Sequence, residues 1–114
     1  MTYRQEFGRQ GENLAKEYLQ SHGYQILTQN YHTRWGELDL VAKKSGELIF
    51  VEVKTRQHGW PEEAVTAFKR AKLYKAIYEY LWQFELRLPW RLIILAIIIN
   101  QEIAKPEIRW VEVD

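Results

Sequence analysis

The sequence contains no cysteine, so it holds neither a disulfide framework nor a thiolate metal site. This composition fits a reducing compartment, and we expect a cytoplasmic protein. Long apolar runs are also missing: the longest extends from Leu92 to Ile99, well short of the roughly 20 residues of a membrane span. The first residues lack the apolar segment of a secretory signal peptide. These absences predict a soluble protein with no membrane partner.

An excess of charge of one sign is absent as well. The formal net charge is +1, from 16 basic and 15 acidic residues. A protein that coats nucleic acid through bulk charge needs a larger basic excess, so any phosphate partner must meet a local patch. The length of 114 residues suits one domain with its own core, and we expect residues 1–114 to form it.

Hydrophobic periodicity predicts two helices and five strands in the order α-β-β-β-α-β-β. Helical spacing covers Gln5–Ser21, with Gly23 just beyond its end, and returns from about Glu62 to Phe84. Strand patterns cover residues 24–31, 37–43, 48–54, 90–99 and 108–113. This order predicts an α/β fold with a central mixed β-sheet flanked by helices.

Two of these strands allow predictions about their faces. Strict alternation in the first strand would place Ile26 and Thr28 on one face. The strand at 48–54 is apolar on both faces, with Phe50 on one and Ile49 and Val51 on the other. We therefore expect it to be a central strand covered on both sides.

The second and third predicted strands form a hairpin around a two-residue loop at 45–46. This register would place Asp39 opposite Glu52 and Glu37 opposite Lys54. Opposed like charges destabilise a sheet, so fold stability gives no reason for the acidic pair. A hard divalent cation such as Mg²⁺, which takes oxygen ligands, does give one.

A metal held by such acids can stabilise charge on a phosphoryl oxygen and activate a bound water. Lys54, two residues beyond Glu52, could orient that water or neutralise the developing charge. The alternative is a solvated strand face on which Lys54 screens the acids. The apolar neighbours of Glu52 favour burial, and acids are almost never buried without a partner.

Two segments carry a family resemblance: GELDLV at 36–41 and FVEVKTR at 50–56. They resemble the core of the PD-(D/E)xK nuclease superfamily, and more narrowly the bacterial YraN-like proteins, which are predicted endonucleases similar to archaeal Holliday-junction resolvases. Leu38 stands where the superfamily has its proline. The resemblance implies a restriction-endonuclease-like core and a Mg²⁺- or Mn²⁺-dependent endonuclease acting on DNA, with branched or structured DNA as candidate substrates.

The resemblance also implies roles for individual residues. Asp39, Glu52 and Lys54 would be the catalytic residues, and Asp39 and Glu52 would bind the metal together with Glu12 of the first helix. Glu12 lies at the border of the apolar stripe of that helix. A solvent-facing acid is an equally good interpretation of its position.

Basic residues near these elements are candidates for the local nucleic-acid-binding patch. They are Arg34, Arg56, Lys69 and Lys72, with Arg70 and Lys75 as further candidates. Lys69 lies within the apolar stripe of the second helix. The commoner explanation for such a position is a lysine whose aliphatic part covers apolar surface while its ammonium group reaches water. The more specific alternative is that Lys69 contacts a phosphate near the site. Trp35, beside the hairpin, could stack on a base or pack in the core.

Two other functions remain open. The chain could be a catalytically silent nucleic-acid-binding module of the same fold, or a protein-interaction domain that uses the exposed edge of its last strand. The chain could also form a homodimer, because the resolvases that it resembles act as dimers on junctions, which present paired strands. The complete set of two acids and a lysine favours the enzyme.

Overall fold

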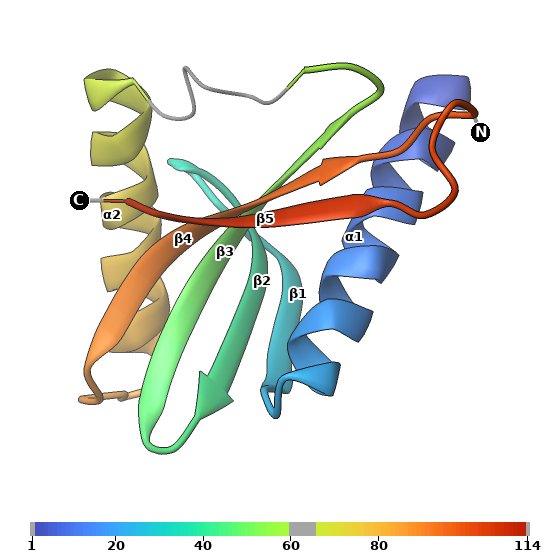
Figure 1. Ribbon diagram of the computed structural model, residues 1–114. Coiled ribbons are helices and arrows are strands. Elements are labelled where there is room, and N and C mark those ends of the chain that lie inside the picture. The colour runs from blue at the N-terminus through green and yellow to red at the C-terminus, as the bar shows by residue number, and fades with distance from the viewer. Residues whose placement is uncertain (1, 60–65, 114) are drawn as a thin grey trace.

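The computed structural model describes residues 2–59 and 66–113. Its elements are α1 (Tyr3–Ser21), β1 (Gln25–Thr33), β2 (Gly36–Lys44), β3 (Glu47–Arg56), α2 (Ala67–Gln83), β4 (Trp90–Ile98) and β5 (Glu107–Glu112). The strands form one sheet in the order β1-β2-β3-β4-β5. β3 and β4 pair in parallel and the other neighbours are antiparallel, so the predicted element order and mixed sheet are confirmed. Figure 1 shows the sheet between α1 and α2.

Capping residues fix where the helices begin. Thr2 and Gln5 form a capping box, which starts α1 two residues earlier than expected. The Thr66 hydroxyl accepts a hydrogen bond from the Lys69 backbone N–H and caps α2, so that helix begins at Ala67. The expected start near Glu62 falls within residues 60–65, outside the described part of the chain. No described helix is both long enough and apolar enough to cross a membrane.

Each helix closes a separate core against one face of the sheet. α1 buries Ala15 and Leu19 in the first core, and α2 buries Leu73, Ala76, Ile77 and Tyr80 in the second. Ile49 and Val51 of β3 belong to the α1 core, whereas Leu48 and Phe50 belong to the α2 core. The prediction of a central strand covered on both sides is therefore confirmed.

A β-bulge in β1 overturns the expected face of Thr28. Ile26 pairs with Ala42 and Thr28 pairs with Val41, so Leu27 is an extra residue in the ladder. Ile26 packs against the α1 core, whereas the Thr28 hydroxyl lies 2.7 Å from the Tyr80 hydroxyl of α2. The extra residue reverses the alternation, so the two side chains lie on opposite faces.

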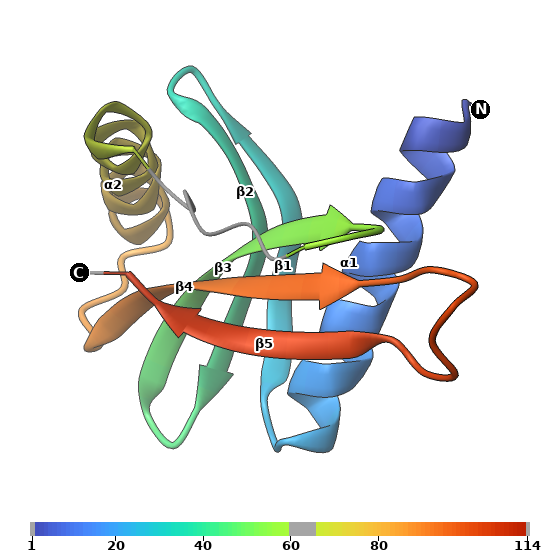
Figure 2. The ribbon, with the colours of Figure 1, turned by 45° about the horizontal axis from the view of Figure 1, so that its top comes forward.

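The β2–β3 hairpin keeps its predicted register for only half its length. Its loop residues Ser45 and Gly46 both have positive φ, as a two-residue hairpin turn requires. The pairs run as expected from Lys44↔Glu47 to Leu40↔Val51, and the ladder ends there. Beyond that point β2 continues beside β1 and β3 beside β4, and Figure 2 shows the two strands diverging.

The divergence makes two predicted facing pairs wrong. Asp39 does not pair with Glu52, because its carboxylate accepts the Val53 backbone N–H at 2.8 Å in place of a ladder partner. Glu37 does not face Lys54. It pairs with His32 of the neighbouring strand β1, and its Oε2 lies 3.2 Å from the Nδ1 of His32. The sheet therefore has a fork between β2 and β3, and the predicted site residues lie around it.

Candidate active site

A surface hollow lies at the fork between β2 and β3. It is lined by residues of α1, β2 and β3 and of the segment after β3: Arg4, Phe7, Gly8, Glu12, Asp39, Glu52, Val53, Thr55, Arg56 and Gln57. Gly11 allows α1 to approach β3 closely, because a Cβ at this position would lie 1.9 Å from the Thr55 hydroxyl oxygen. The next residue of the helix is Glu12. The close approach of the helix thus carries a carboxylate to the fork.

Three carboxylates gather on the α1 side of the fork. One carboxylate oxygen each from Glu12, Glu37 and Asp39 lies within 4.8 Å of the other two. Two of these acids, Glu12 and Asp39, are ones that the sequence assigned to a metal site. Glu37 was missed as a member, although its position two residues before Asp39 was a signal, since alternate strand residues share a face.

Burial and mutual repulsion make these acids hard to ionise. Burial, and after it the charge of Glu52, raises the pKa of Asp39 to about 7, against the opposing effect of the hydrogen bond from Val53. Burial and then Glu37 raise the pKa of Glu12. A cation among these oxygens would relieve both effects, because it favours the ionised form of each acid.

Glu52 is held by two lysines from different elements. Its Oε1 lies 3.4 Å from the Nζ of Lys54 on β3 and 3.4 Å from the Nζ of Lys69 on α2. The side chains of Glu52 and Lys54 are only 13% and 15% exposed, so this ion pair is largely shielded from water. Burial and the neighbouring Lys69 ammonium lower the pKa of Lys54.

The structure brings some of the predicted basic residues to the hollow and places others elsewhere. Arg56 lines the hollow, and Lys69 reaches Glu52. Arg34 lies over the ring of Trp35, and Lys72 lies over a phenylalanine ring of its own helix, at 4.7 and 4.6 Å from the ring centroids. Trp35 itself packs against the α2 core, where Lys75 also lies over its ring. Arg4 lines the hollow and was missed, because nothing in its local sequence distinguishes it from a solvated charge.

These features define an α/β domain with clustered carboxylates and a largely shielded acid–lysine pair at a fork in its sheet. The chain belongs to the family described as "Uncharacterised protein family UPF0102", whose model matches residues 11–99. This family is the YraN-like group, so the resemblance drawn from the sequence is confirmed. The matched range includes all three clustered acids and the pair of Glu52 and Lys54.

Relatives from several bacteria share most of this length. A UPF0102 protein of Syntrophomonas wolfei is 54% identical over 79 residues, which cover 67% of this chain and 69% of the relative. One from Desulfitobacterium hafniense is 39% identical over 116 residues, covering 96% of this chain and 95% of the relative. One from Porphyromonas gingivalis is 40% identical over 98 residues, covering 83% of this chain and 73% of the relative.

Proposed function

We propose that the chain is a metal-dependent phosphodiesterase of the endonuclease type that acts on DNA. The observation that carries this proposal is the arrangement at the fork. Glu12, Asp39 and Glu52 line the hollow. Glu12 and Asp39 lie close to a third carboxylate, that of Glu37, and Glu52 forms an ion pair with Lys54. Carboxylates that converge in one hollow, with an ammonium group paired to one of them, can hold a cation and a phosphate oxygen together.

The residues present suit a hard divalent cation. Every clustered donor is a carboxylate oxygen, which is the ligand type that Mg²⁺ and Mn²⁺ prefer over softer metals. Glu12 and Asp39, with Glu37 or Glu52, would hold the ion. When bound, it would supply charge stabilisation at a phosphoryl oxygen and a more acidic water.

The chain's own residues would then position the reacting groups. Lys54 would donate a hydrogen bond to the attacking water or to a phosphate oxygen, and Glu52 fixes the position of its Nζ. Lys69 holds Glu52 from the α2 side, which keeps that carboxylate in place. Arg56, at the rim of the same hollow, would bind a flanking phosphate.

The test is cleavage of single-stranded, duplex and branched DNA in Mg²⁺ or Mn²⁺. We expect Glu52→Gln and Lys54→Met each to lower the cleavage rate by about 100-fold or more, as loss of a group that stabilises the transition state does. Glu17→Gln, at an exposed position of α1, is the matched control and should cleave at the wild-type rate.

Two results would contradict the proposal. One is wild-type protein that cleaves none of these substrates, and the other is cleavage that persists unchanged in both site variants. DNA binding without cleavage would instead favour the catalytically silent binding module.

A further inference from the structure

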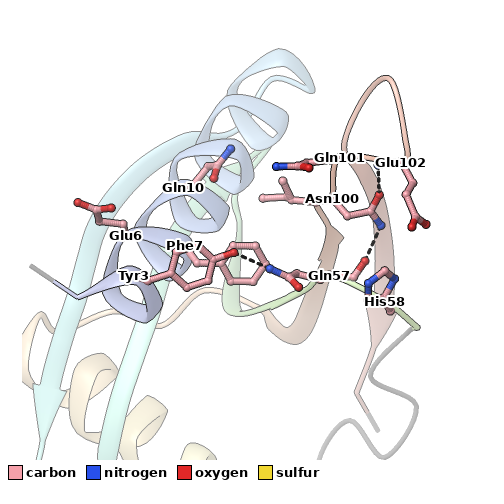
Figure 3. Close-up of a pocket in the computed structure, with 10 residues that line it drawn as sticks. Tyr3, Glu6, Phe7, Gln10, Gln57, His58, Asn100, Gln101 and Glu102 are labelled. Atoms are coloured by element: carbon pink, nitrogen blue, oxygen red, sulfur yellow. Dashed lines mark hydrogen bonds between the residues drawn. The ribbon is translucent and has the colours of Figure 1, made fainter.

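A second hollow, of about 510 Å³, lies beside the candidate active site. It lies between the first turns of α1, the segment after β3 and the loop from β4 to β5 (Figure 3). Its lining residues are Tyr3, Glu6, Phe7, Gln10, Gln57, His58, Ile99, Asn100, Gln101 and Glu102. Phe7 and Gln57 line both hollows, so the second hollow adjoins the first.

Aromatic rings and hydrogen-bonded amides form one side of this second hollow. The rings of Tyr3 and Phe7 lie nearly parallel, with an interplanar angle of 8° and centroids 6.2 Å apart. The Gln57 amide donates to the Tyr3 hydroxyl at 2.5 Å, and the Asn100 amide donates to the Gln57 backbone carbonyl at 2.5 Å (Figure 3). These bonds tie α1, the end of β3 and the β4–β5 loop together around the hollow.

Two further amides remain available to a ligand. Gln10 extends its amide from α1, and Gln101 extends its amide from the β4–β5 loop, into the space between these elements (Figure 3). Within residues 2–59 and 66–113, neither amide has a hydrogen-bond partner. Each offers one acceptor and two donor positions.

The charges of the two hollows differ. The second is lined by the acids Glu6 and Glu102 and by no lysine or arginine among its described lining residues. The first carries Arg4 and Arg56 beside its acids. A phosphate is therefore disfavoured in the second hollow, whereas a neutral ring with donor groups on its edge is favoured. Amides and carboxylates bond to such edges, and aromatic side chains stack on such rings.

We propose that the second hollow binds the base of an unpaired nucleotide next to the phosphate held in the active site. The inference rests on the proposed function, because the active-site hollow supplies the adjoining phosphate. A base inside a duplex is stacked and paired, so its removal from the stack carries a free-energy cost that an unpaired base does not. The hollow therefore selects single-stranded or branch-point nucleotides over continuous duplex.

Short single-stranded oligodeoxynucleotides test this inference. One carries bases at every position, and the other is the same backbone with abasic residues throughout. Binding is measured by fluorescence anisotropy in Mg²⁺, in a Lys54→Met background so that the DNA is not consumed. The pocket variant is Gln10→Ala/Gln101→Ala, and the matched control is Gln20→Ala, an exposed glutamine in the last turns of the same helix.

We expect the pocket variant to weaken binding of the base-containing strand by about 30-fold, since it loses two hydrogen bonds that contribute about 1 kcal/mol each. Its affinity for the abasic strand should match that of the control. Equal weakening for both strands, or no change for either, would overturn the inference while leaving the proposed function intact. If neither the background protein nor the wild-type protein binds either strand, both the inference and the proposed function fail.

Discussion

At the scale of single residues, Asp39 shows how this site works against the stability of the metal-free fold. Its carboxylate is mostly buried, and the charges of Glu52, Glu12 and Glu37 all act to raise its pKa. The pKa of about 7 in the folded state is higher than the ordinary value of 3.8. Ionisation of Asp39 therefore destabilises the fold. This cost is absent below about pH 4, grows as the pH rises, and is complete above about pH 7.

Asp39→Asn should consequently stabilise the metal-free protein at about pH 8 and have little effect at about pH 4. A shift of three pKa units corresponds to roughly 4 kcal/mol, so we expect the free energy of unfolding to rise by about 2–4 kcal/mol at the higher pH. Urea denaturation in the presence of a chelator measures it. Glu17→Gln, a change at an exposed acid, should show no such pH dependence. A loss of stability in Asp39→Asn at both pH values would contradict this account.

At the scale of elements, the contact between α1 and β3 determines where Glu12 lies. Gly11 is buried, and the space that its Cβ would occupy is filled by the side chain of Thr55. Gly8, one turn earlier in the same helix, has no atom of the described residues within 4 Å of its own Cβ position, apart from the neighbouring backbone of its own helix. The two glycines therefore have different roles, although the sequence alone gives them the same appearance.

Gly11→Ala should destabilise the protein by about 1–3 kcal/mol through overpacking, and thermal or urea unfolding measures the loss. Gly8→Ala is the matched control and should raise stability by about 0.5–1 kcal/mol, because alanine is the better helix former. Thr55→Ala removes the closest atom and should recover part of the loss in a double variant with Gly11→Ala. Equal effects of the two glycine variants would show that α1 does not pack as closely as described.

At the scale of the whole molecule, the two helices on opposite faces of the sheet contribute side chains to one candidate site. α1 brings Glu12 to the fork, and α2 brings Lys69 to Glu52. The acids and lysines therefore come from four elements: α1, β2, β3 and α2. A cation that bound the clustered acids would join α1 to β2 and so stabilise the whole fold.

Mg²⁺ or Mn²⁺ should accordingly raise the Tm of the wild-type chain. A ligand at 100 times its Kd adds about 2.7 kcal/mol, which corresponds to a shift of roughly 10 °C for a domain of this size. The shift should shrink as the pH falls below about 7, where Asp39 takes up a proton, and it should be lost in Asp39→Asn. NaCl at the same ionic strength is the salt control and Glu17→Gln the protein control. An equal shift in NaCl would contradict specific binding.

Much of the fold followed from local patterns in the sequence. Apolar spacing predicted both helices and all five strands, and the double-sided apolar pattern of β3 marked it as central because only a strand covered on both faces can bury both sets of side chains. The turn at Ser45 and Gly46 predicted the hairpin and its register as far as Leu40 and Val51. Family membership was also readable from the segments at 36–41 and 50–56.

Only the tertiary structure decided how the site is built. The bulge at Leu27 and the fork between Asp39 and Leu40 are features of pairing between strands, and no local pattern in the sequence predicted them. The sequence placed Asp39 directly opposite Glu52; in the fold, the Val53 N–H takes that place, and Asp39 gathers with Glu12 and Glu37 instead. The sequence thus determined which acids and lysines the protein has and on which strands they lie. The packing of two helices against a diverging sheet decided which of them meet, because side chains distant in sequence come together only when the layers close.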